Sequence, residues 1–169
     1  MIPELRHTIA GETVSIRPLQ LTDVDMEAEF IRGLSPRSKH FRALAAVNEV
    51  PLSDVRRLCE VDGTQSVAFV ATVRRTSREE AIGVSRYAPM ANTNAREIAI
   101  TVADEWQQKG LGAVLVTHLI EYAKAKGVKQ LCAIDLVNNA GMHALAKHLG
   151  MSATPDPGDP YQTIYSLAL

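Results

Sequence analysis

The amino-acid sequence predicts one domain of the α/β or α+β class, with helices flanking a mixed sheet. The first observation is the order of its apolar patterns, which runs as a strand, a helical region, a block of strands, and then helix, strand, helix and strand. The second is composition, because 169 residues with 46% hydrophobic and 22% charged residues suit a globular protein with one sizeable core. The sequence contains no internal repeat or low-complexity linker, so we expect a single domain over residues 1–169.

The first part of the chain predicts one strand followed by three helical segments. ETVSIRPLQ alternates between apolar and polar residues and is typical of a strand over 13–19. Each helical segment then begins with a residue type that favours a helix N-terminus. The expected caps are Thr22 or Asp23 for a helix reaching Leu34, Ser35 before Pro36 for a helix within 34–47, and Ser53 for a helix within 51–63 that Gly63 ends.

The period of the apolar residues changes to two in the middle of the chain. SVAFVATV and EAIGVSRYAPM predict a hairpin. AREIAITVA predicts the third strand of this block, which is the fourth strand predicted along the chain. LGAVLVTHLIEYAKAKG follows with the spacing of a core-facing helix that ends near Gly127. The apolar run QLCAIDLV predicts a strand inside the sheet, AGMHALAKHLG a helix that Gly150 stops, and YQTIYSLAL a closing strand after the loop PDPGDP.

Charge and cysteine usage exclude several function classes. A formal charge of -1 and a pI near 6.5 argue against a general nucleic-acid binder. We expect no membrane partner, because no apolar stretch approaches the roughly 20 residues that cross a bilayer. Cys59 and Cys132 lack C-x-x-C spacing and are expected to be reduced thiols in a cytoplasmic protein. The five histidines show no spacing suited to zinc, so we expect no metal; the oligomeric state is left open.

The stretch QQKGLG, residues 107–112, lies between a predicted strand and a predicted helix. A strand that enters a helix through glycines leaves first-turn N–H groups unpaired, and the helix dipole favours an anion there. The spelling matches neither a Walker phosphate loop nor the G-x-G-x-x-G dinucleotide fingerprint. Taken alone, the stretch is equally compatible with a tight turn that binds nothing.

Its context resembles a known motif. ITVADEWQQKGLGAVLVTHLIEYAKAKG is similar to the acetyl-CoA-binding motif of the GNAT N-acetyltransferase superfamily, in which [Q/R]-x-x-G-x-[G/A] joins a strand to a helix. Gln107, Gly110 and Gly112 occupy its defining positions, and Asp104 stands where the family often has a proline. Asn139 and the later Leu-Gly-Met resemble the family's second motif. The upstream segments resemble the GNAT domains of bacterial protein-lysine acetyltransferases.

The resemblance implies a mostly antiparallel mixed sheet that splays between its fourth and fifth strands, with the pantetheine arm of acetyl-CoA in the opening. The backbone of Ile100, Thr101 and Val102 is then expected to pair with the pantetheine amides. Asn139 is expected to contact the cofactor, to cap its helix, or to do both. The amides expected to hold the pyrophosphate are those of Gln107, Gln108, Lys109, Gly110, Leu111, Gly112 and Ala113.

The resemblance also implies transfer of the acetyl group to a primary amine, and Glu97 matches the glutamate implicated as general base in the resembled enzymes. A base is needed because a free lysine amine has a pKa of about 10.4 and reacts only when neutral. Many family members carry a tyrosine as general acid at the position that is Ala146 here, so Tyr161, Tyr165 or a water remain as alternatives. The acceptor is a protein lysine or a small-molecule amine such as a polyamine, amino sugar or amino acid. A non-catalytic acyl-CoA-binding regulatory module is the third hypothesis.

Overall fold

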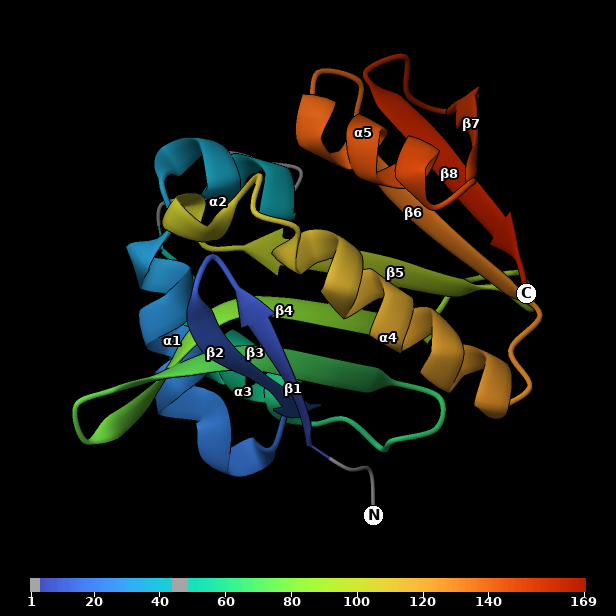
Figure 1. The fold of residues 1–169 in the computed structure, drawn as a ribbon. Helices are drawn as coiled ribbons and strands as arrows, with labels where there is room; N and C mark the ends of the chain where they lie inside the picture. Colours follow the sequence, from blue (N-terminus) through green and yellow to red (C-terminus); the bar gives the residue numbers. More distant parts are fainter. Residues whose placement is uncertain (1–3, 44–48) are drawn as a thin grey trace.

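An eight-stranded mixed sheet forms the centre of the fold in the computed structural model, which describes residues 4–43 and 49–169 (Figure 1). The strands lie in the order β1-β2-β3-β4-β5-β6-β8-β7, and β5 and β6 are the parallel pair in an otherwise antiparallel sheet. The strands are β1 Leu5–Ile9, β2 Glu12–Pro18, β3 Val67–Arg75, β4 Arg78–Pro89, β5 Arg96–Val102, β6 Gln130–Leu136, β7 Ser152–Pro155 and β8 Gln162–Ala168.

Helices cover both faces of this sheet (Figure 1). The α-helices are α1 Val24–Gly33, α2 Pro36–Ala43, α3 Leu52–Cys59, α4 Leu111–Ala125 and α5 Ala140–His148, and short 3-10 turns occupy Leu21–Asp23 and Asp104–Trp106. One core joins α4 and α5 to the sheet through side chains such as Leu115, Leu119 and Ile98. A second core joins α1 and α3 to the opposite face through side chains such as Phe30 and Val84.

The N-terminal hairpin is the main element that the sequence reading missed. β1 pairs with β2 through a two-residue turn in which both Ala10 and Gly11 have a positive φ, of 50° and 80°. This geometry suits the right-handed twist of a hairpin, but it normally selects asparagine, aspartate or glycine at the first position. β7 was also missed, because this exposed edge strand carries no alternating apolar pattern and ends in Pro155.

The predicted helix starts were confirmed in one case and wrong in another. α2 begins at Pro36, and the Ser35 hydroxyl accepts the Ser38 N–H over 3.2 Å, as a capping serine should. The last expected residues of this helix fall among 44–48, outside the described residues. Ser53 does not cap α3, because the helix already begins at Leu52 and Pro51 takes the N-cap position.

The helix ends were predicted unevenly. α4 and α5 are each followed by a glycine in the left-handed region, Gly127 and Gly150, as predicted. The Val128 N–H donates back to Ala123 O over 3.0 Å, which closes the last turn of α4. α3 ends at Cys59, before the predicted terminator Gly63.

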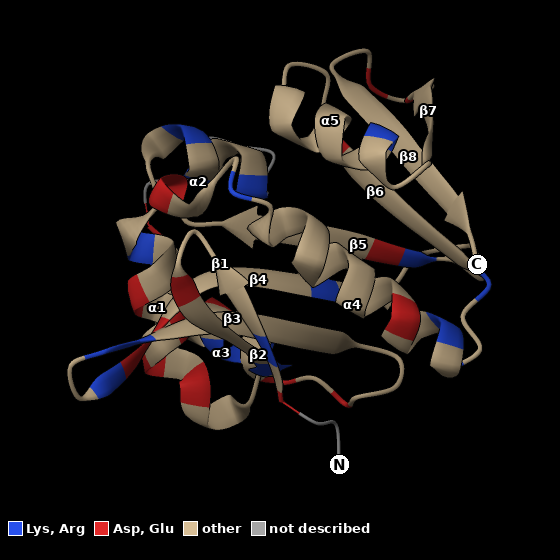
Figure 2. Ribbon diagram, viewed as in Figure 1, with Lys and Arg blue, Asp and Glu red and all other residues tan. Residues whose placement is uncertain are grey.

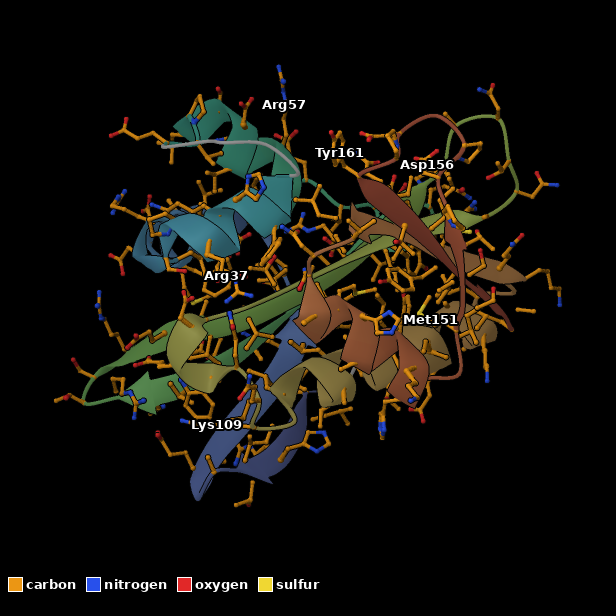
Figure 3. The ribbon with its side chains drawn as sticks, turned by 90° about the horizontal axis from the view of Figure 1, so that it is seen from above. Arg37, Arg57, Lys109, Met151, Asp156 and Tyr161 are labelled. Atoms are coloured by element: carbon orange, nitrogen blue, oxygen red, sulfur yellow. The ribbon has the colours of Figure 1, made fainter. Side chains whose placement is uncertain are left out.

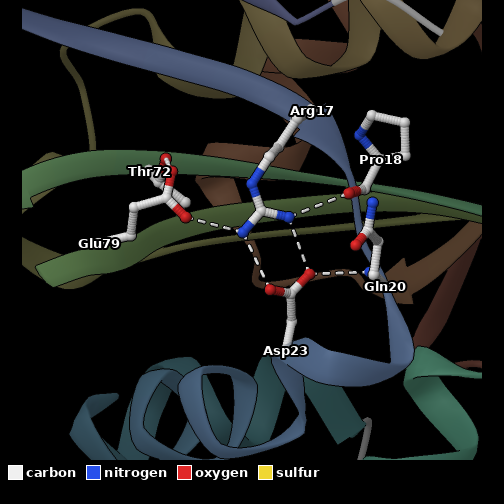
Figure 4. A network of polar contacts seen from close by, with 6 residues as sticks. All are labelled: Arg17, Pro18, Gln20, Asp23, Thr72 and Glu79. Carbon is white, nitrogen blue, oxygen red and sulfur yellow. Dashed lines mark hydrogen bonds and ion pairs between the residues drawn. The ribbon is translucent and has the colours of Figure 1, made fainter. Parts of the chain in front are cut away.

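The predicted cap Asp23 occupies the N-cap position of α1 but turns its carboxylate to the sheet instead (Figure 4). Arg17 of β2 donates from both terminal nitrogens to Asp23, over 2.8 and 2.9 Å, and also to Glu79 of β4 over 2.9 Å. Partial burial acts to raise the pKa of Asp23, and the bonds from Arg17 and the Gln20 N–H outweigh it, so that this pKa lies below its usual value. The arginine therefore ties the start of α1 to two strands.

Candidate active site

The parallel pair β5 and β6 separates after a short contact. Arg96 lies opposite Leu131 and Glu97 opposite Cys132, and beyond them β5 runs on to Val102 without a β6 partner among the described residues. β6 turns instead to β8, with which it pairs along its whole length. The described sheet therefore has a V-shaped opening between β5 and β6, which are the fourth and fifth of the strands predicted from the sequence.

The direction of the β5 backbone decides which groups face this opening. Opposite residues in an antiparallel pair alternate between those that exchange hydrogen bonds and those that do not. The Ala103 N–H donates to Ile82 O over 2.9 Å, which puts Thr101 among the β5 residues bonded to β4. The N–H and C=O groups of Ile100 and Val102 therefore point the other way, into the opening.

Thr101 thus differs from the other two residues expected on this strand. Its backbone groups face β4, opposite Val84, so they are not free to pair with a ligand between β5 and β6. The side chains of β5 alternate between the two faces of the sheet, because Ile98 is buried against α4 while Glu97 is exposed. The backbone direction depends on the register with β4, which no local pattern encodes.

The connection from β5 to α4 carries two residues in the left-handed region, Gln108 with φ 58° and Gly110 with φ 88°. Gly110 is the N-cap of α4, and no side chain in the described part of the chain caps that helix. The first-turn N–H groups of α4, from Leu111 to Ala113, therefore have no capping side chain among the described residues. Because α4 is 15 residues long and its dipole adds to these N–H groups, its start is suited to an anion.

The two glycines of the motif differ in backbone conformation and in the space around them. Gly110 has a positive φ, so a side chain there strains the backbone, although no atom of residues 4–43 or 49–169 lies within 4 Å of an added Cβ. Gly112 has no such φ, and an added Cβ would make ordinary contacts of 3.8 Å with Val102 and 3.9 Å with Leu145. The turn thus requires Gly110, whereas packing within the protein leaves room for a Cβ at Gly112, and that space is open to a ligand.

The side chains of the loop are bound to the protein itself. Gln107 donates from Nε2 to Val102 O and to Ser38 Oγ, each over 3.1 Å. Lys109, labelled in Figure 3, places its ammonium over the Trp106 ring, 5.6 Å from the ring centroid. These contacts engage the Gln107 and Lys109 side chains, and the backbone N–H groups of the loop remain the part that can receive an anion.

Asn139 caps α5. Its side-chain oxygen accepts the Met142 N–H over 3.2 Å, and its amide nitrogen donates to Asp135 over 3.1 Å. Burial raises the pKa of Asp135, although the bonds from the Leu136 N–H and from Asn139 act against that rise. The capping role weighed from the sequence is confirmed, while contact with a cofactor stays a prediction.

Glu97 lies at the vertex of the opening, on the face of the sheet that carries α1 and α3. It and Ala99 are both exposed, although β5 is an interior strand of the sheet. Among the described residues no arginine or lysine pairs with Glu97. Its two arginine neighbours are bonded elsewhere, Arg96 to Gln65 and Arg86 to Leu58 O and Glu27.

A buried ion pair beside this face was missed by the sequence reading. Arg86 of β4, opposite the exposed Ala99, donates to Glu27 of α1 over 3.3 Å, and the Glu27 side chain is 1% exposed. Burial raises the pKa of Glu27, against the opposing effect of Arg86 and Arg42. One signal was present, because Glu27 lies on the apolar side of α1, three residues before Phe30 and four before Ile31.

The tyrosines considered as general acids differ in access. Tyr165 is 2% exposed and lies in the core, and burial raises its pKa, so it is withdrawn from the opening. Tyr161 is 73% exposed on the turn before β8 (Figure 3), and its carbonyl accepts the N–H of the exposed Val137 at the end of β6. Ala146 is buried between α5 and the sheet.

Residues 4–43 and 49–169 contain neither a cluster of metal ligands nor a helix that could span a membrane. That part of the chain contains no group of three His, Cys, Asp or Glu side chains that could hold a metal. No helix in it is long and apolar enough to cross a membrane. Cys59 and Cys132 are buried free thiols, and burial raises the pKa of Cys59 to about 11.

Comparison with known proteins identifies the family. Residues 39–151 match the Acetyltransferase (GNAT) family. The chain belongs to the GNAT acetyltransferases. An acetyltransferase of Pseudomonas aeruginosa is 40% identical over 159 residues, which cover 94% of this chain and 86% of that relative. Membership implies acetyltransferase activity with acetyl-CoA as the donor and an acceptor molecule.

Solved structures show the same fold for this GNAT acetyltransferase. The GNAT domain of S. lividans PAT has a TM-score of 0.88 at 23% identity, with 100% of both chains covered. A cAMP-binding acyltransferase from Mycobacterium smegmatis has a TM-score of 0.66 at 22% identity, covering 99% of this chain and 47% of that one. These likenesses confirm the predicted mixed sheet of the GNAT fold, with its parallel pair β5–β6.

Proposed function

We propose that this protein transfers the acetyl group of acetyl-CoA to a primary amine by direct attack, without an acyl-enzyme intermediate. The observation that carries the proposal is that the free edge of β5 and the uncapped start of α4 adjoin each other. Ile100 and Val102 offer backbone groups to the pantetheine amides, and the N–H groups of Leu111, Gly112 and Ala113 receive the pyrophosphate. Residues 107–110 form the loop that leads into these N–H groups.

Glu97 is the general base in this proposal. It lies at the vertex of the opening, is exposed, and has no basic partner among the described residues, so its carboxylate is free to accept a proton from an ammonium group. The Ile100 N–H, directed into the opening, is suited to stabilise the oxyanion that forms on the acetyl carbonyl. The leaving thiolate needs no strong acid, since a thiol with a pKa near 8.5 departs tolerably as an anion.

A lysine on a protein surface is the acceptor that the surroundings favour. The side chains of Glu97 and Ala99 are exposed, and α2 carries three arginine or lysine residues over Pro36–Ala43 with no acidic residue (Figure 2). Val137 and Tyr161, which are 56% and 73% exposed, lie where β6 ends and form an apolar rim. An apolar rim beside basic charge suits a protein surface better than a small polycation.

The test is a thiol-release assay with acetyl-CoA and two acceptor sets, lysine-containing proteins from a cell extract and a panel of small amines. Mass spectrometry then locates the acetyl group on each product. The proposal expects thiol release together with acetyl-lysine on proteins. Thiol release with small amines alone would contradict the protein acceptor. Binding of acetyl-CoA with no thiol release in the presence of either acceptor set would contradict the transfer reaction.

A further inference from the structure

Asp104 joins the loop that precedes α4 to the start of α2. Its carboxylate accepts the Ser35 N–H over 2.9 Å, the Ser35 hydroxyl over 2.6 Å and the Ser38 hydroxyl over 2.8 Å. Partial burial acts to raise the pKa of Asp104, and these bonds outweigh it, so that the pKa lies below its usual value. The side chain is therefore a charged acceptor at neutral pH, and charged hydrogen bonds are among the stronger ones.

The chain of bonds continues from α2 back to the opening. Ser38 Oγ, besides donating to Asp104, accepts a bond from Gln107 Nε2 over 3.1 Å. The same nitrogen of Gln107 donates to Val102 O, one of the backbone groups that face the opening. One connected network thus runs from α2 through Ser38 and Gln107 to the edge of β5.

The two ends of this network belong to different parts of the site. Gln107 begins the segment proposed to hold the pyrophosphate, and Val102 lies on the strand edge proposed to hold the pantetheine. α2 packs against β5, the strand that presents Glu97, and its basic residues adjoin the proposed acceptor side. A change in the order of the loop therefore reaches α2 through two side chains, Gln107 and Asp104.

We propose that Asp104 and Ser38 are positioning residues that couple acetyl-CoA binding to the placement of α2 beside the acceptor. The inference rests on the proposed function, because it needs acetyl-CoA on residues 107–113. A bound pyrophosphate holds the loop in one conformation, which keeps the Gln107 amide and the Asp104 carboxylate aligned with Ser38. By linkage, the same coupling strengthens acetyl-CoA binding once the acceptor has ordered α2.

Amide hydrogen exchange with acetyl-CoA as the probe tests this coupling without knowledge of the acceptor. In the wild-type protein, saturating acetyl-CoA is expected to slow exchange about tenfold in two segments, 107–116 and the α2 segment 37–43. In Asp104→Ala and in Ser38→Ala, 107–116 keeps its protection while the gain in α2 falls by more than half. Each variant leaves only one connection, Gln107 to Ser38 in the first and Asp104 to Ser35 in the second. Asp104→Asn, which retains one accepting oxygen, is expected to show an intermediate gain.

Glu105→Gln is the matched control. It removes the same charge from an exposed side chain that lies one residue after Asp104. It is expected to behave like the wild type in both segments. Equal protection of α2 in the wild type, Asp104→Ala and Ser38→Ala would overturn the coupling while leaving the proposed function intact. Lack of protection at 107–116 in the wild type would overturn the proposed cofactor site, and the coupling with it. A thermal melt of each variant identifies any that fails to fold, and the remaining two variants then decide.

Discussion

Glu97 of β5 lies opposite Cys132 of β6 in the last parallel pair before the two strands separate. The residue proposed as general base is thus fixed at the vertex of the opening, by pairing with a strand on either side. The register holds the start of the open β5 edge and the exposed carboxylate in one fixed arrangement.

Glu97→Gln should lower kcat by about two to three orders of magnitude while the Kd for acetyl-CoA stays the same. The amide keeps the shape of the side chain but does not take up a proton from the amine. Steady-state kinetics together with calorimetric titration of acetyl-CoA measure the two quantities. Glu121→Gln, an exposed glutamate on α4, is the control. A Glu97→Gln variant with wild-type kcat across the pH range would show that the base lies elsewhere.

Gly112→Ala should weaken acetyl-CoA binding about tenfold, with little change in the free energy of unfolding. The position has an ordinary helical backbone, and its neighbours leave space that the proposed ligand needs. Gly110→Ala should instead lower the free energy of unfolding by about 1 kcal/mol, because its backbone has φ 88°. Titration and urea unfolding of both variants test this contrast. The interpretation of Gly112 is wrong if its variant binds acetyl-CoA with wild-type affinity.

Glu27→Ala should lower the free energy of unfolding by about 3 kcal/mol, because it leaves the arginine Arg86 partly buried and without its carboxylate. Urea unfolding measures the loss. Glu29→Ala on the same helix is the matched control, since its pair with Arg78 is exposed and should contribute less than about 1 kcal/mol. Equal losses in the two variants would contradict the structural importance of the buried pair.

His118 should make the protein less stable as the pH falls below about 6.5. Burial lowers the pKa of this histidine, with Glu121 acting against the shift and His7 with it, and its Nε2 is buried without a partner among the described residues. The unfolded chain therefore binds a proton at a higher pH than the folded protein, so stability present above pH 6.5 is lost as the pH falls. Melting temperatures between about pH 7.5 and 5.5 should drop less steeply for His118→Phe than for the wild type. A parallel drop in both would contradict the assignment, and His148→Gln on α5 is the control.

Short-range features were the ones that the sequence could predict. The loop before α4, the helix after it and the glycines that end α4 and α5 depend on residues within one or two turns of each other. The faces of β5 also follow from alternation along the strand. The hairpin at Ala10 and Gly11 escaped prediction because an alanine with positive φ gives no turn signal.

The rest of the site depends on contacts between distant residues. Glu27 and Arg86 are 59 positions apart, and Ser35 and Asp104 are 69 apart, so no local pattern joins them. The backbone direction of Thr101 is likewise set by its register with β4. The sequence therefore predicts the loop before α4 well, and the contacts of α1 and α2 with the rest of the chain poorly.

Amide chemical-shift changes on titration with acetyl-CoA show whether the cofactor lies between β5 and the start of α4. The largest changes are expected on two groups, the amides of Ile100 and Val102 and those from Gly110 to Ala113. Changes that spare both groups, or that cluster at another surface such as the 300 Å³ pocket formed with Lys126 and Lys129, would contradict this placement of the cofactor.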